Sequence, residues 1–280
     1  MSPLDACLST GKPHRRRRIL LSAAGAVLAL AVLKGVAADT WSSGGADPAV
    51  TARLLGLADR ITDVPADHHS GPYTYLHSQS WARMPGPDRH DLIGRVDVEH
   101  WQHITGTVHM ATRRLPSWPD LDHTVDGSDR PQFTGAPLHT GDFTAKQVQP
   151  PIAPEAIATD PASLTAQLLR LRHSTGTDEL LFAITEINYY GYVGRTQRAT
   201  ILRVLAGLAG IGYDGETADI AGRTGVTFRY TGLAQAATTW LTINPTTGEI
   251  LAYRRVFVAT GRTIFSRYWL LLDRDRREYL

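Results

Sequence analysis

Hydrophobic and polar positions show their clearest pattern between residues 195 and 230. In the first part, apolar residues recur every three or four positions, which predicts an amphipathic helix with arginines on its other faces. The apolar positions are Ile201, Leu202, Leu205, Leu208 and Ala209, and the arginines are Arg195, Arg198 and Arg203. Closely spaced glycines at 207, 210 and 212 then end the helix and redirect the chain.

Alternation of apolar and polar residues replaces the helical period further along and predicts a strand. Val226, Phe228 and Tyr230 share one face, whereas Thr227 and Arg229 point the other way. An amphipathic helix therefore delivers the chain onto an antiparallel sheet, and we expect the later strand-like runs to continue that sheet.

A structural turn motif is predicted where this sheet begins, in the segment Asp219–Val226. Gly222 and Gly225 flank a turn or bulge in which glycine supplies the positive φ that other residues avoid. We expect Gly222 or Gly225 to hold a backbone conformation closed to other residues. We also expect Arg223 to tie the turn to a neighbouring strand or helix end, so that Asp219, Gly222, Arg223 and Gly225 have a structural role.

The other periodic segments predict strands, then helices in the middle of the chain, then strands again. Helices are expected to start at Asp47-Pro48 and Asp160-Pro161, where an aspartate caps the first turn, and a third helix is expected to begin at Asp178. The predicted strands are residues 73–78, 93–104, 107–113, 238–243, 249–258 and 263–272. Residues 132–158 predict a long surface loop, and residues 273–277 a solvated charged tail. This order predicts an α+β fold, with helices packed on one face of an antiparallel sheet.

Charge is distributed unevenly along the 280 residues. The net charge is +2, but six basic residues and one acidic residue precede residue 39, so the 23 basic and 26 acidic residues that follow carry −3. A slightly acidic body is a poor nucleic-acid binder, because such binding depends on neutralising phosphates. The single cysteine, Cys7, allows no disulfide within the chain and no thiolate metal site.

The amino-terminal segment predicts membrane attachment. A basic cytoplasmic tail (1–18) precedes an apolar segment (19–38) of about the ~20 residues that a transmembrane helix needs. A flexible tether (39–46) then leads to an extracytoplasmic domain (47–280). A cleaved signal peptide is the alternative, because Val36-Ala37-Ala38 resembles a small-residue cleavage site. Both interpretations place the domain outside the cytoplasm.

None of the candidate residues in the sequence indicates a catalytic, cofactor or metal site. On a strand, His100 and His103 point to opposite faces and cannot share one ion, so the eleven histidines are interpreted as surface or structural residues. Ser78 and Ser80 have no recognisable base partner, and no Gly-x-Ser-x-Gly motif occurs. The glycines of residues 207–212 follow a helix rather than a strand and do not form a nucleotide loop.

Several segments, taken in order, resemble one protein family. These segments are residues 71–78, 126–130, 159–164, 198–210, 219–226 and 243–251. The family comprises extracytoplasmic proteins of actinobacteria that have one amino-terminal membrane segment and no assigned activity, and are often encoded beside an extracytoplasmic-function sigma factor. By looser analogy, the predicted architecture is similar to the half-barrel of the lipoprotein carrier LolA and the sigma-factor regulator RseB, in which a curved antiparallel sheet packs against helices.

These features together favour a membrane-tethered binding or sensory module without enzymatic activity or a cofactor. A groove between a curved sheet and apolar helices is suited to a lipid, a lipoprotein tail or a partner protein. A hydrolase with a non-standard site is the alternative, and a purely structural envelope protein stays open as a third.

Topology yields the first testable prediction. With the amino terminus inside and the body outside, a reporter fused after Leu280 is expected to be active only in its export-dependent form. Intact-mass analysis of membrane fractions is expected to retain residues 1–38. A mature chain that starts at Asp39 would show that the apolar segment is a cleaved signal peptide and not a membrane anchor.

Overall fold

The computed structural model describes most of the chain after the predicted tether, namely residues 45–85, 91–118, 125–144, 156–172, 176–232, 237–259 and 262–280. The predicted cytoplasmic tail and membrane helix, and the tether up to residue 44, lie outside the described residues. Among the helices that are described, none is both long and apolar enough to cross a membrane. Residues 46–280 form one unit, whose architecture follows.

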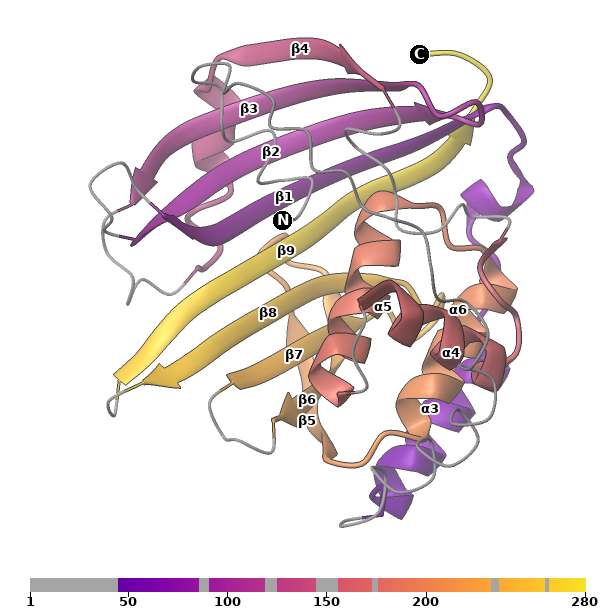
Figure 1. Ribbon diagram of the computed structural model, residues 1–280. Coiled ribbons are helices and arrows are strands. Elements are labelled where there is room, and N and C mark those ends of the chain that lie inside the picture. Colours follow the sequence, from indigo (N-terminus) through magenta and orange to yellow (C-terminus); the bar gives the residue numbers. More distant parts are fainter. Residues whose placement is uncertain are drawn as a thin grey trace, which may run out of the picture. The chain divides into compact units, whose positions relative to one another are not determined.

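Nine antiparallel strands form one open sheet in the order β4-β3-β2-β1-β9-β8-β7-β6-β5 (Figure 1). In the first part of the chain the strands are β1 Tyr73–Pro85, β2 Asp91–His103, β3 Val108–Trp118 and β4 Leu138–Phe143. In the second part they are β5 Ile211–Ala218, β6 Thr224–Thr231, β7 Ala237–Ile243, β8 Ile250–Ala259 and β9 Arg262–Arg277. The sheet leaves β4 and β5 as free edges, and with four helices it confirms the predicted α+β class.

The longest strand, β9, occupies the centre of the sheet and corrects one prediction. Residues 273–277 are not a solvated tail, because they pair with β1 in a register that places His77 opposite Asp273. Several of these charged residues are tolerated because they find partners beside the strand. Arg277 lies 3.5 Å from the centre of the Tyr75 ring, and Asp275 contacts His69 at 2.7 Å.

A second correction concerns the predicted surface loop at residues 132–158. This segment contains a short 3₁₀ helix, η2 (Pro131–Gly135), and the edge strand β4, which pairs with β3. The β4 side chains are exposed or half-buried, so the strand lacks the alternation that a buried face imposes. An edge strand of this kind leaves little trace in the hydrophobic pattern.

In the described part of the chain, four helices pack beside the sheet: α3 Pro48–Arg60, α4 Pro161–Arg172, α5 Thr177–Tyr190 and α6 Arg195–Ala206 (Figure 1). Two predicted caps are confirmed, because Asp47 accepts from the Ala49 amide at 2.8 Å and Asp160 from the Ser163 amide at 2.9 Å. An apolar stripe of α3 is buried, namely Val50, Leu54, Leu57 and Ala58, and Ile61 directly after the helix is buried as well.

Large aromatic side chains fill the space between α5 and the middle of the sheet. Tyr189 of α5 stacks on Trp269 of β9 with ring centres 4.7 Å apart, and Phe182 and Tyr253 lie against the same tryptophan. The cavity between Tyr189, Tyr253 and Trp269 measures about 20 Å³, which holds about one water. The described residues under α5 therefore form a packed core.

A further core lies on the opposite face of the sheet. Trp81 and Tyr268 pair across β1 and β9, next to the pair of Ser80 and Trp269, so they point away from α5. The Trp81 ring meets Phe133 of η2 edge-on, with ring centres 5.6 Å apart. The centre of the sheet is thus covered on both sides.

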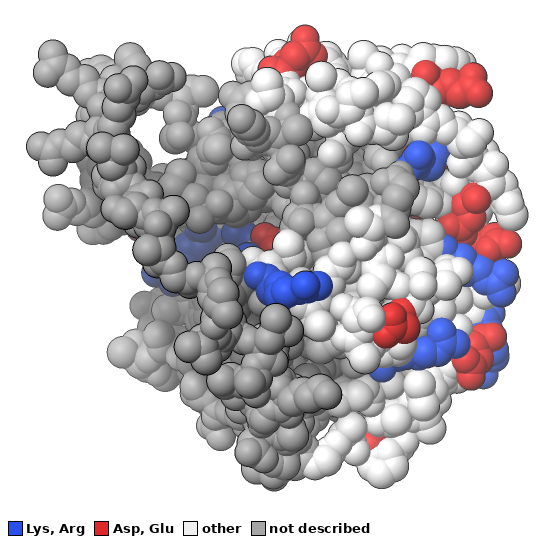
Figure 2. Space-filling view, turned by 45° about the vertical axis from the view of Figure 1, so that its right-hand side comes forward, with Lys and Arg blue, Asp and Glu red and all other residues white. Residues whose placement is uncertain are grey.

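Surface charges of both signs are interspersed on the face shown in Figure 2. Arg203 of α6 pairs with Asp59 at 2.8 Å, and Arg195 with Asp63 at 3.4 Å. These arginines of α6 are therefore already paired with carboxylates and are not free to bind phosphates.

Buried His100 of β2 gives a prediction about pH. Burial lowers its pKa to about 4, although a hydrogen bond with the backbone of Tyr190 favours the protonated form. The unfolded chain takes up this proton near pH 6.5, so stability is complete above pH 6.5 and decreases as pH falls towards 4. Chemical denaturation of the full chain is expected to show a loss of about 2 kcal/mol from this group at pH 5.

The control is His100→Gln, which keeps a polar side chain but does not titrate. The difference in unfolding free energy between pH 7.5 and pH 5 is expected to shrink by that amount in the variant. Equal pH dependence in both proteins would show that folding does not lower the pKa of His100.

Candidate functional site

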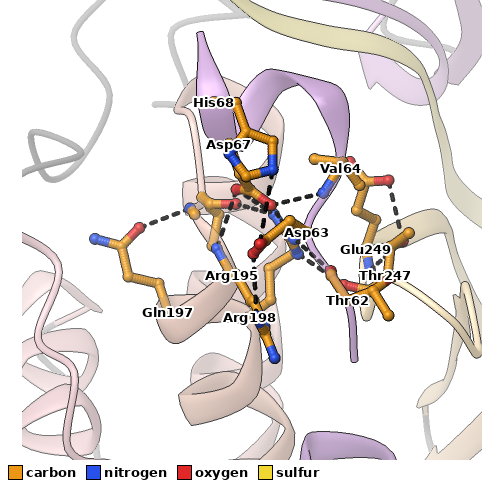
Figure 3. A network of polar contacts seen from close by, with 12 residues as sticks. Thr62, Asp63, Val64, Asp67, His68, Arg195, Gln197, Arg198, Thr247 and Glu249 are labelled. Carbon is orange, nitrogen blue, oxygen red and sulfur yellow. Dashed lines mark hydrogen bonds and ion pairs between the residues drawn. The ribbon is translucent and has the colours of Figure 1, made fainter. Parts of the chain in front are cut away.

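Buried charges gather where the 3₁₀ helix η1 (Pro65–His68) meets the start of α6 (Figure 3). Arg198 of α6 is 1% exposed and forms a two-pronged ion pair with Asp67 of η1. Its Nη2 donates to Oδ2 of Asp67 at 2.7 Å, and its Nη1 donates to Oδ1 at 3.1 Å. This paired geometry is the strongest form of an arginine–carboxylate contact.

Backbone carbonyls satisfy the rest of the Arg198 guanidinium. Nε donates to Thr247 at 2.7 Å, Nη1 to Val193 at 2.9 Å and Nη2 to Thr62 at 3.4 Å. Thr247 belongs to the loop between β7 and β8, so one side chain joins three separate parts of the chain. The expected position of Arg198, on a polar face of the helix, is therefore wrong.

Asp67 is also saturated with donors. Besides Arg198, it accepts from the Val64 and Arg195 amides at 2.8 and 3.1 Å and from the Tyr192 hydroxyl at 2.7 Å. Burial raises the pKa of Asp67, but the hydrogen bonds from Arg198, Val64 and Tyr192 outweigh burial and bring the pKa to about 2. Asp67 is consequently a permanent carboxylate with no free acceptor.

A second buried arginine, Arg274 of β9, has no such partners. Its side chain is 1% exposed, and none of the described residues forms a hydrogen bond with Nε, Nη1 or Nη2. The Glu249 carboxylate lies 3.8 Å from Nε, too far for a hydrogen bond. Burial lowers the pKa of Arg274, but an arginine remains charged in a protein. Five N–H donors of a cation are thus left unsatisfied.

A cavity of about 250 Å³ lies beside Arg274, between the η1 segment and the strands β8 and β9. Its wall includes Val64, His69, Arg223, Glu249, Leu271 and Arg274. The three Arg274 nitrogens each expose less than 1 Å². Together, the cavity and the unsatisfied guanidinium form the candidate site, which we call the Arg274 cavity.

The predicted turn motif contributes to the same wall. Asp219 accepts from the Ala221 amide at 2.8 Å and from Nε of Arg223 at 2.8 Å, which closes the turn between β5 and β6. Arg223 also donates through Nη2 to the carbonyls of Leu271 at 2.5 Å and Leu251 at 3.3 Å. The structure therefore brings Arg223 to the Arg274 cavity, and its contacts tie the turn to β8 and β9.

The two glycines of this motif meet different constraints. Gly222 has a φ of +79°, a conformation that suits glycine. Gly225 does not have a positive φ, but a Cβ there would lie 2.7 Å from Cγ2 of Thr242 and 2.9 Å from the Ile243 oxygen. Close approach of the neighbouring strand β7 thus requires glycine at position 225.

Ser78 and Ser80, for which the sequence shows no base partner, are buried in β1 and are not among the residues of the cavity wall. Within the described ranges, no three histidine, cysteine or acidic side chains come together as a metal site would require.

A separate charged cluster surrounds Asp97 of β2. This buried carboxylate interacts with His77, Gln79 and Arg113 at 3.0, 2.9 and 2.9 Å. Burial raises the pKa of Asp97, and the hydrogen bonds from His77 and Gln79 reverse this effect and lower it overall. With three partners already in place, the cluster has a structural role.

Comparisons of the whole chain with protein-family models and with curated protein sequences found no match.

The close approach at Gly225 gives a prediction about stability. Gly225→Val forces a branched side chain against Thr242 and the Ile243 carbonyl, and is expected to lower the free energy of unfolding by about 1–3 kcal/mol. Gly212→Val on the paired strand β5 is the matched control, because a Cβ there meets only the Arg229 oxygen at 3.8 Å. Denaturation curves that show equal stability for the two variants would contradict this account of the turn.

Proposed function

We propose that residues 47–280 are a membrane-tethered extracytoplasmic binding or sensory module whose ligand occupies the Arg274 cavity. The observation that carries the proposal is a buried guanidinium to which none of the described residues offers a hydrogen bond, beside a cavity of about 250 Å³. Native proteins satisfy nearly all buried polar groups, so an exception of this kind beside a cavity is typical of a binding site.

The proposal places the amino terminus in the cytoplasm and anchors the module through the apolar segment 19–38. The basic residues before this segment and its length support that placement. The ligand is a lipid, a lipoprotein or a segment of a partner protein in envelope signalling, and nucleic acid is not among the proposed partners. The acidic balance of the body and the paired charges on α6 support this choice.

Similarity to the anchored actinobacterial family, and to the half-barrel of LolA and RseB, is part of the proposal. The open antiparallel sheet with helices beside it agrees with that architecture. Curvature is supported by Arg223, which donates to β8 and β9 although its own turn lies between β5 and β6. Adjacent strands are about 4.8 Å apart, so a flat sheet would hold Arg223 too far away for these contacts.

The volume of the cavity restricts what the ligand places inside it. About 250 Å³ lies just below the usual range for small-molecule sites, which starts near about 300 Å³. A head group or the end of a chain fits this volume, whereas a whole acyl chain does not. The larger remainder of a lipid or peptide therefore lies outside the cavity.

Native mass spectrometry tests the proposal. The full chain, purified in mild detergent from membranes of its own source cells, is expected to carry a non-covalent adduct. Leu272→Trp adds bulk to the cavity wall and is expected to lose the adduct, whereas Leu138→Trp changes an exposed leucine of β4 and is expected to keep it. A bare wild-type chain, or equal adducts in both variants, would refute the proposal.

A further inference from the structure

We propose that the ligand presents an oxyanion, a carboxylate or a phosphate, to Arg274. This inference rests on the proposed binding function and adds the chemical class of the group that enters the cavity. It starts from Arg274, whose buried guanidinium lies next to a carboxylate that is too distant to bond with it.

Neighbouring carboxylates cannot satisfy Arg274 in the present arrangement. Asp67 already accepts five hydrogen bonds, which occupy both of its oxygens. Glu249 accepts from the Thr247 hydroxyl at 3.1 Å through Oε2, and its Oε1 stays 3.8 Å from Nε of Arg274. The missing acceptor must therefore come from Glu249 after a movement or from a bound molecule.

The other charges of the cavity wall have partners of their own. Arg223 pairs with Asp219 at 2.6 Å, and His69 contacts Asp275 at 2.7 Å. Arg274 is thus the lining cation whose hydrogen-bonding capacity is unused among the described residues. A planar guanidinium binds carboxylate or phosphate through two parallel hydrogen bonds, so it selects an oxyanion over a neutral or cationic group.

Glu249 controls access to this donor. Its side chain is 20% exposed, and it is the acidic residue closest to the guanidinium in the cavity wall. We infer that the incoming oxyanion replaces Glu249 beside Arg274 while Glu249 turns towards solvent. One negative charge then replaces another, so the buried cation is never left without a counter-ion.

Isothermal titration calorimetry of the full chain in detergent tests the inference. The probes are sodium phosphate, sodium acetate and octyl phosphate, each at constant ionic strength maintained with chloride. At least one oxyanion is expected to bind saturably at millimolar concentration or below. The affinities for phosphate and acetate, when compared, show whether the site prefers a phosphate or a carboxylate. The affinities for octyl phosphate and phosphate, when compared, distinguish a lipid head group from a free anion.

Two variants and one control make the test specific. Arg274→Met removes the donor and is expected to weaken binding at least tenfold, whereas Glu249→Gln removes the competing charge and is expected to strengthen it several-fold. Arg276→Met is the control, because Arg276 lies two residues further along β9 and donates to the Gly71 carbonyl at 3.0 Å. Its oxyanion binding is expected to match the wild type.

Arg274→Met is expected to fold, because methionine replaces a desolvated charge with an apolar chain of similar length. If near-ultraviolet circular dichroism shows that it does not fold, Glu249→Gln decides the question. Absence of oxyanion binding, or affinity unchanged in Arg274→Met or Glu249→Gln, would overturn the inference. A neutral adduct that is lost in Leu272→Trp, without oxyanion binding, would refute the inference and leave the proposed function intact.

Discussion

The ion pair between Arg198 and Asp67 holds the helical layer and the sheet together at one point. It fixes η1 to α6 and to the loop between β7 and β8 through hydrogen bonds that leave neither partner unsatisfied. Removal of one partner of such a buried pair typically costs about 3–5 kcal/mol, because the other charge remains in the interior. The same pair positions Val64 at the cavity wall and uses the full capacity of Asp67, which leaves Arg274 without an acceptor.

Much of the fold follows from local signals in the sequence. Capping aspartates at 47 and 160 and the apolar stripe of α3 are properties of neighbouring residues, so sequence alone predicts these helices. Strands that bury one face, such as β6, are equally readable. The end of β9 and the edge strand β4 lack this pattern, because one is charged and only partly buried and the other is mostly exposed.

The candidate site is much less predictable than the fold. The turn motif drew attention to Arg223, whose contacts with β8 and β9 depend on strands that follow much later in the chain. Arg198 looks like a surface residue of an amphipathic helix, since its partner Asp67 lies 131 positions earlier. Arg274 sits in a run of alternating charges that suggests solvent. In each case the surroundings that determine the role of the arginine are distant in sequence, so no local periodicity indicates them.

The central place of β9 also determines when the sheet can be completed. Strands β1 and β8 both pair with β9, so each has an unpaired edge until residues 262–277 have been synthesised. The two halves of the sheet therefore cannot join during translation of the first eight strands, and the many long-range pairings favour slow folding. If the proposed export accompanies synthesis, the chain crosses the membrane before β9 can join the two halves of the sheet. The chain then stays extended for transport, but its unpaired strand edges are vulnerable to association with other chains.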